Sequence, residues 1–304
     1  MSGLTTRKTR QTRQTRQTSK QLKPLQGGQS LFSTTDFNWG WNALSFLVTK
    51  PDEDEDTTLA FPVYPFKTNP INQYAKISPN VLTLYPNEIS VLYFAGLGMS
   101  LKRASRTGFD IMKTFESLEY SATVYVIDQM SSFSLESLIQ SCAELINELV
   151  VIDKPLYIIG FSLGTGISTY SLLRWQSENT FSSRRISLIL LSPFTSLVDA
   201  FYEKKSFDEV NEHDHEPTMF ENIANEMIGN TLNLQSALKQ IKDVDITIVS
   251  ALDDEITFYG QAKRLFELVS KSKSIKTKFI TLESGGHWVS LKNLKNKSYL
   301  KLLL

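Results

Sequence analysis

From residue 59 onward, short apolar runs alternate with amphipathic stretches, and this alternation limits the fold more than any other feature. Runs of four to eight apolar residues are typical of buried strands, whereas longer stretches with apolar residues three and four apart are typical of helices. The expected strands are 59–66, 81–85, 89–94, 123–127, 156–159, 186–191, 246–249 and 277–281. The expected helices are 100–118, 135–150, 163–175, 259–270 and 289–300. The pattern predicts an α/β domain over 59–304, with a mostly parallel sheet flanked by helices.

One interval interrupts the alternation. Residues 198–243 contain helical patches but no convincing strand. So long an excursion in a compact domain is typically a lid rather than a loose loop. We therefore expect a small helical cap after the sixth strand, placed over the carboxyl ends of the strands, where the sites of open parallel sheets lie.

The segment before the domain has a different composition. Residues 1–35 repeat Thr-Arg-Gln three times and carry seven Lys and Arg but no acid. Too few apolar side chains are present to offset the entropy of ordering, which predicts a disordered basic tail. Residues 36–58 are interpreted as a linker with an acidic run at 52–56. The tail suits an anionic membrane surface, an acidic partner or an organelle-import signal, and a passive extension is the alternative.

Charge and cysteine content exclude several classes of function. Without its tail the chain has 25 basic and 32 acidic residues, and this acidic body argues against binding nucleic acid. The single cysteine, Cys142, excludes an intramolecular disulfide and lies on a helical pattern, where a buried filler is expected. No apolar run is long enough for a membrane span, and no secretory signal is present, so we expect an intracellular, cytoplasmic protein.

A nucleophile is predicted where the strand at 156–159 turns into a helix. The turn reads Gly-Phe-Ser-Leu-Gly at 160–164. A Gly-x-Ser-x-Gly sequence between a strand and a helix is typical of a nucleophile elbow, in which the serine adopts a strained conformation that exposes its hydroxyl. We expect Ser162 to be that nucleophile, and Leu163 to supply one backbone N–H of an oxyanion hole.

A serine nucleophile requires a histidine base and an acid later in the chain. His287 follows the last strand and is the expected base, whereas His213 and His215 lie in a polar part of the cap and are expected to be solvated. Their spacing lacks a closed ligand pattern, so neither a metal nor a cofactor is expected. The acid comes from Asp253, Asp254 or Glu255 after the strand at 246–249, and the pattern alone does not choose among them. The two acids that are not used are expected to be solvated.

The second oxyanion donor should come from the loop at 95–99, where Gly96 and Gly98 allow the backbone to approach a substrate. Leu97 is the expected donor. A glycine turn that only links strand to helix would have the same sequence.

With these residues in order, the chain from about residue 59 resembles the α/β-hydrolase fold family, in particular its compact serine esterase, lysophospholipase and depalmitoylase members. The resemblance depends on Gly160–Gly164, on Ser-Pro-Phe-Thr-Ser-Leu at 192–197, on Asp-Glu-Ile at 254–256 and on Gly286-His287. It implies Asp254, rather than Asp253, as the catalytic acid. The chain departs from the family pattern at Ala95-Gly96, where the family has His-Gly, and at 128–132, where Asp-Gln-Met-Ser-Ser replaces Arg-Gly-x-Gly.

The sequence therefore predicts a serine hydrolase that cleaves a carboxylic ester or thioester of a small-molecule or lipid-like substrate through an acyl-enzyme. The alternative is a non-catalytic binding or scaffolding protein with the same fold, because fold alone does not establish activity.

Overall fold

The fold is described here from a computed structural model of the chain. The structure describes residues 61–79, 85–129, 134–152, 154–179, 186–197, 199–200, 232–272 and 274–303. The predicted tail and linker lie outside these residues, as do most of the predicted cap and with it His213 and His215. None of the helices in the described ranges combines the length and the apolar character that crossing a membrane requires.

The core of the domain is an eight-stranded sheet with the order β1-β2-β4-β3-β5-β6-β7-β8. Strands β3 to β8 are parallel to one another. At one edge of the sheet, β2 runs antiparallel to both of its neighbours, β1 and β4. The strands are β1 (Val63–Pro65), β2 (Gln73–Ile77), β3 (Asn87–Phe94), β4 (Tyr120–Asp128), β5 (Leu156–Phe161), β6 (Ile186–Leu191), β7 (Asp245–Ala251) and β8 (Thr277–Leu282). The predicted mostly parallel sheet is confirmed.

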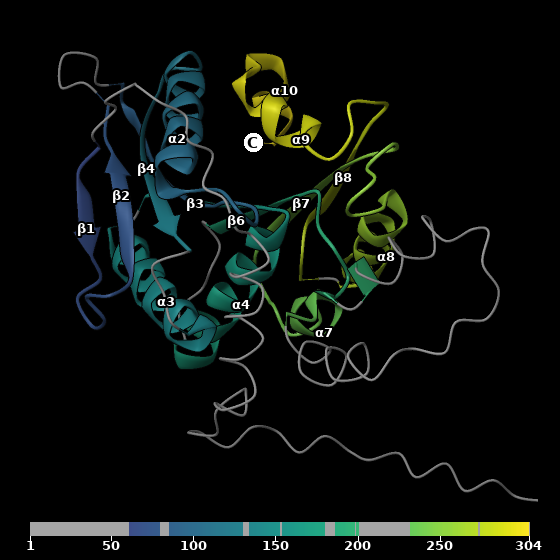
Figure 1. The fold of residues 1–304 in the computed structure, drawn as a ribbon, viewed down its shortest axis with the longest axis horizontal. Helices are drawn as coiled ribbons and strands as arrows, with labels where there is room; N and C mark the ends of the chain where they lie inside the picture. Colours follow the sequence, from purple (N-terminus) through teal and green to yellow (C-terminus); the bar gives the residue numbers. More distant parts are fainter. Residues whose placement is uncertain are drawn as a thin grey trace, which may run out of the picture. The chain divides into compact units, whose positions relative to one another are not determined.

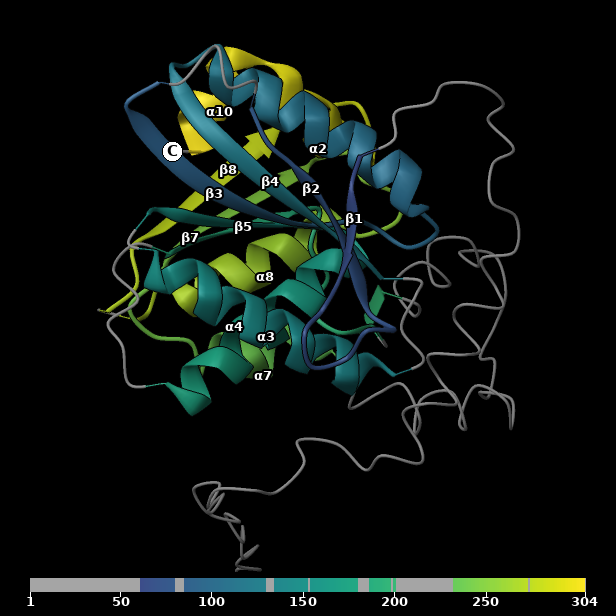
Figure 2. The same cartoon turned by 90° about the vertical axis from the view of Figure 1, so that its left-hand side faces the viewer.

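Helices cover both faces of this sheet (Figures 1 and 2). One face carries α2 (Leu101–Glu116), α9 (Val289–Lys292) and α10 (Lys297–Leu303), and the other carries α3 (Leu135–Val151), α4 (Leu163–Glu178), α7 (Leu234–Leu238) and α8 (Tyr259–Val269). Serine side chains cap the N-termini of two of these helices. Ser100 accepts a hydrogen bond from the Arg103 N–H at the start of α2, and Ser134 accepts one from the Ser137 N–H at the start of α3. The α/β layering predicted from the alternation is therefore present.

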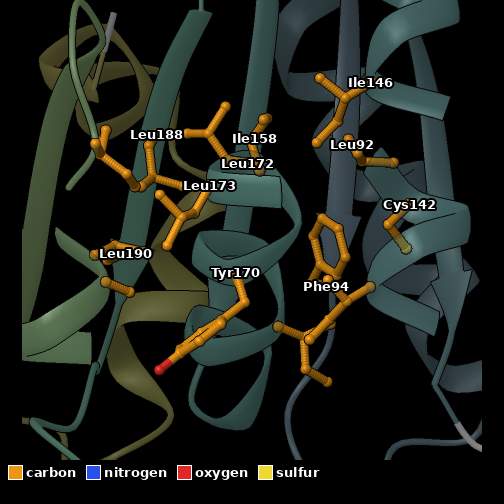
Figure 3. Close-up of a cluster of buried hydrophobic side chains, with 14 of the residues drawn as sticks. Leu92, Phe94, Cys142, Ile146, Ile158, Tyr170, Leu172, Leu173, Leu188 and Leu190 are labelled. Carbon is orange, nitrogen blue, oxygen red and sulfur yellow. The ribbon is translucent and has the colours of Figure 1, made fainter. Parts of the chain in front are cut away.

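The larger buried cluster lies between the central strands and helices α3 and α4 (Figure 3). Leu92, Ile158 and Leu188 project from β3, β5 and β6 toward side chains of the two helices. Cys142 on α3 is fully buried in this cluster, and burial raises the pKa of its thiol. It is therefore a packing residue, as predicted.

Two element predictions differ from the structure. The second strand is 73–77 rather than 81–85; of the predicted segment, 81–84 lies outside the described residues and Tyr85 is not in a strand. The predicted helix at 289–300 is broken into α9, a 3-10 turn at Asn293–Lys295 and α10. The break occurs because Asn296 is extended and its side chain accepts a hydrogen bond from Ser298 N–H, which starts a new helix.

Candidate active site

Ser162 lies between the end of β5 and the start of α4, in a backbone conformation that non-glycine residues rarely adopt. Its φ is 50° and its ψ is −120°. Glycines on either side permit this turn: a methyl group at Gly164 would lie 2.2 Å from the Phe94 carbonyl oxygen, and one at Gly160 would lie 2.5 Å from Ser168 Oγ. Strain of this kind persists where the surrounding packing enforces it, and it often marks a functional position.

Asp254 and His287 form a buried pair at the carboxyl ends of β7 and β8. Both carboxylate oxygens of Asp254 lie 3.0 Å from His287 Nδ1, and the two residues are only 2% and 3% exposed. Burial alone would raise the pKa of Asp254, but hydrogen bonds from His287, Thr257 and Ile256 outweigh it and hold the pKa below its usual range. The ionised carboxylate fixes the Nδ1–H tautomer of the imidazole, leaving Nε2 as the proton acceptor.

Buried hydroxyl groups surround this pair. Thr257 Oγ1 lies 3.0 Å from Asp254 Oδ2 and 3.0 Å from the Ser192 carbonyl oxygen. Ser192 Oγ in turn donates to the His287 carbonyl oxygen at 3.0 Å and lies 2.8 Å from Ser290 Oγ. Ser192 belongs to the Ser-Pro-Phe-Thr-Ser-Leu segment, so the sequence pattern marks this residue although it does not indicate its contacts.

Aromatic packing brings His287 next to the serine turn. The His287 ring packs against the ring of Phe161, the residue that immediately precedes Ser162, with the two ring centroids 5.0 Å apart and the planes tilted by 41°. The Trp288 ring packs on Phe161 at the same distance. Within the described residues, no hydrogen bond joins Ser162 Oγ to the His287 ring. Hydrogen bonds between nucleophile and base are often long in unliganded enzymes and shorten when substrate binds.

Asp253 and Glu255, the other two acids of the loop after β7, are both exposed. Of these two, Asp253 also binds the backbone of the neighbouring loop. Asp253 accepts hydrogen bonds from the N–H groups of Gly285 and Gly286, each at 2.9 Å. These two bonds also lower the pKa of Asp253. Both glycines have positive φ and precede His287 directly. Asp253 is exposed, as predicted for an acid that the triad does not use, and it also holds the loop that presents His287.

The loop at 95–99 lies against the serine turn. A methyl group at Gly96 would lie 3.3 Å from Ser162 Cβ and 2.9 Å from the Phe161 ring. Leu97 is 39% exposed. Within the described residues, neither the N–H of Leu97 nor that of Leu163 has a hydrogen-bond acceptor. Both predicted donors are thus available on the two segments that meet at Ser162.

Three solved esterases have a similar architecture. An esterase from Pyrobaculum calidifontis superposes with a TM-score of 0.56 at 11% identity, with 89% of this chain and 90% of the esterase covered. Carboxyl esterase 2 from Tuber melanosporum gives a TM-score of 0.53 at 16% identity, covering 88% of this chain and 95% of that one. An esterase from Pyrococcus furiosus gives 0.52 at 10% identity, covering 80% and 87%. The chain has the α/β-hydrolase fold.

Sequence comparison finds a likeness over less than half of the chain. Lysophosphatidylserine lipase ABHD12 from Danio rerio is 30% identical over 137 residues, which cover 43% of this chain and 34% of the lipase. The chain thus matches about a third of the length of that curated relative. No family profile matches the sequence.

The α/β-hydrolase fold brings the candidate residues together from four parallel strands. The loops that follow β3, β5, β7 and β8 supply residues 95–99, Ser162, Asp254 and His287 respectively. Because the carboxyl ends of parallel strands meet at one edge of the sheet, candidate residues more than 100 positions apart in sequence lie at the same edge.

Proposed function

We propose that this protein is a serine hydrolase that cleaves a carboxylic ester or thioester through an acyl-enzyme intermediate. The observation that supports the proposal most directly is the strained Ser162 turn, packed through Phe161 against the buried Asp254–His287 pair. A strained serine, a histidine and an ionised acid in this arrangement are the parts that nucleophilic acyl transfer requires.

In the proposed reaction, Ser162 Oγ attacks the carbonyl carbon of the substrate while His287 Nε2 takes the hydroxyl proton. Asp254 stabilises the positive charge that develops on the imidazole. The carbon–oxygen or carbon–sulfur bond of the substrate then breaks, and the leaving group receives the proton from His287. Water, deprotonated by His287, next attacks the acyl-enzyme and releases the acid and free Ser162.

The negative charge of the tetrahedral intermediate would be held by the N–H groups of Leu163 and Leu97. Leu163 is the first residue of α4, so the positive end of that helix dipole points to the same place. Neither N–H has a competing acceptor among the described residues. Fixed donors of this kind stabilise the transition state without reorganising during the reaction.

A lipid-like acyl group is the substrate class that the surroundings favour. Three exposed apolar side chains, Leu97, Leu252 and Ile256, belong to the loops after β3 and β7 that flank the site, and they are 39%, 54% and 36% exposed. Apolar side chains at the edge of a site can bind an acyl chain by burying its methylene groups. The likeness to a lysophosphatidylserine lipase supports the same class.

Covalent labelling by a fluorophosphonate tests the proposal. Ser162 in the wild-type protein should displace fluoride and become labelled, and it should also turn over a p-nitrophenyl ester. In Ser162→Ala we expect no labelling and a loss of turnover on the order of 10⁴- to 10⁶-fold, with unchanged circular dichroism.

A matched control is Ser177→Ala, since Ser177 lies on the exposed last turn of the same helix and bonds only the Arg174 carbonyl oxygen among the described residues. This variant should label like the wild type. Equal labelling of Ser162→Ala would refute the assignment of the nucleophile. A folded wild-type protein that neither labels nor turns over esters would favour the alternative, a binding or scaffolding protein.

A further inference from the structure

Gln129 is a buried polar side chain next to the proposed site, and the triad does not use it. It follows the last residue of β4 and is 6% exposed. Its side-chain Nε2 donates a hydrogen bond of 2.8 Å to the carbonyl oxygen of Ala95. Ala95 is the first residue after β3 and opens the loop that contains Leu97. Gln129 therefore links the end of β4 to the start of the proposed oxyanion loop.

The Ala95 carbonyl lies where that loop meets the serine turn. A methyl group at Gly164, two residues after Ser162, would lie 2.5 Å from the Ala95 oxygen. On the other side of the same peptide, Gly96 approaches the Cβ of Ser162. A rotation of the Ala95–Gly96 peptide would also turn the next peptide, whose N–H belongs to Leu97. The direction of the Leu97 N–H thus depends on the position of the Ala95 carbonyl.

We propose that Gln129 is a positioning residue that holds the Ala95 carbonyl and thereby aims the Leu97 N–H at the developing oxyanion. The inference is based on the proposed acyl-transfer function. The two places where the chain departs from the pattern of the family that it resembles, Ala95-Gly96 and Asp128-Gln129, are the two that this hydrogen bond joins. The two departures from the family pattern are therefore in direct contact with each other.

If Gln129 only stabilised the fold, its substitution would have different effects from those of a positioning residue. A buried amide N–H needs an acceptor, so the bond would stabilise the fold wherever it lay. The structural role alone would leave the affinity for tetrahedral adducts unchanged in any variant that still folds. The positioning role predicts that substrate binding is retained while stabilisation of the tetrahedral state is lost.

The test uses Gln129→Glu and Gln129→Met in the full-length chain, with a p-nitrophenyl ester and an alkyl boronic acid, which forms a tetrahedral adduct with the serine. Glutamate keeps the shape of Gln129 but places an acceptor against the Ala95 oxygen, and methionine has similar length but no donor. We expect kcat to fall about 10- to 100-fold in both variants, because a small displacement of an oxyanion donor has effects of this order. The affinity for the boronic acid should fall by a similar factor, and KM should change by less than about threefold. If Gln129→Glu does not fold, Gln129→Met decides the question.

A control for the loss of an amide–carbonyl bond is Gln176→Glu. Gln176 is half-buried, and its Nε2 donates a solvent-exposed hydrogen bond of 2.6 Å to the carbonyl oxygen of Lys242. This variant should keep the wild-type kcat and boronic acid affinity. Folded Gln129 variants with unchanged kcat and affinity, or with a change in KM alone, would overturn the role of Gln129 while wild-type labelling still supports the hydrolase. A wild-type protein that does not label would overturn both proposals.

Discussion

The neighbouring acids Asp253 and Asp254 both act on His287, but through different parts of the residue. Asp254 contacts the imidazole itself and is almost completely buried, so its charge is directed at the ring of the proposed base. Asp253 is exposed and holds the backbone of the two preceding glycines. One carboxylate thus sets the tautomer of the ring, and the other limits the motion of the loop that carries it.

This division predicts unequal effects of the same substitution. In Asp254→Asn the amide cannot stabilise the imidazolium and favours the wrong tautomer, so kcat should fall on the order of 10³- to 10⁴-fold. In Asp253→Asn one of two acceptors for the loop N–H groups is lost, so kcat should fall by less than about tenfold. Steady-state kinetics on a soluble ester measure both effects. Equal losses in the two variants would show that Asp254 is not the specific partner of His287.

For single residues, the sequence predicts which side chains are suited to the chemistry, but it does not predict their hydrogen-bond partners. The strained turn at Ser162 and the position of His287 after the last strand were predictable, because the turn pattern and the strand order restrict both strongly. The work of Asp253 was not, because its two partners are backbone N–H groups that no side-chain pattern records. The same holds for Gln129, whose acceptor is a carbonyl oxygen 34 residues earlier in the chain.

At the scale of elements, the start of α4 and the end of β3 are packed so closely that only glycine fits between them. A methyl group at Gly164 would lie 2.2 Å from the Phe94 carbonyl oxygen and 2.5 Å from that of Ala95. Both atoms belong to the backbone, so neither can move aside as a side-chain tip could. The close packing keeps the proposed oxyanion loop in contact with the serine turn.

We therefore expect Gly164→Ala to lower the free energy of unfolding by about 1–3 kcal/mol or more, as overpacking of a well-packed region does, and to lower kcat as well. The matched control is Gly260→Ala in α8, where an added methyl group would contact nothing within 4 Å. That variant should gain about 0.5–1 kcal/mol, since alanine is the better helix residue, and keep its activity. Urea unfolding and ester kinetics measure both. A neutral effect of Gly164→Ala would mean that β3 and α4 can separate without cost.

Most elements were predictable because their apolar patterns are strong. The parallel strands of the core, such as β3 and β5, are almost continuous apolar runs, and these define strands well. β2 was missed because its sequence, Gln-Tyr-Ala-Lys-Ile, is short and half-polar, and its pairing with β4 is antiparallel and long-range. The break between α9 and α10 was missed because the apolar spacing continues across Asn296, whose side chain caps the start of α10.

For the molecule as a whole, the sheet edge that forms the site also concentrates carboxylates that are held in their charged form. Hydrogen bonds from the Gly285 and Gly286 N–H groups lower the pKa of Asp253. Burial would raise the pKa of Asp254, but the bonds from His287 and the backbone outweigh it and lower the pKa. Because unfolding breaks these bonds, proton binding at the two residues is coupled to the stability of the whole domain.

The lowered pKa values fix the sign of this coupling. Above the ordinary aspartate pKa of about 4, the acids are ionised in both states and their hydrogen bonds contribute fully to folding. As the pH falls from there through the lowered pKa values, the unfolded chain takes up protons first, so the free energy of unfolding should fall. Asp254→Asn lacks one of these carboxylates and should lose stability less steeply over the same range. Urea titrations between about pH 3 and about pH 7 measure the slopes. As a control, Gly260→Ala changes no titratable group and should shift the whole curve of unfolding free energy against pH in parallel. A wild-type slope in Asp254→Asn would show that Asp254 keeps its ordinary pKa in the folded protein.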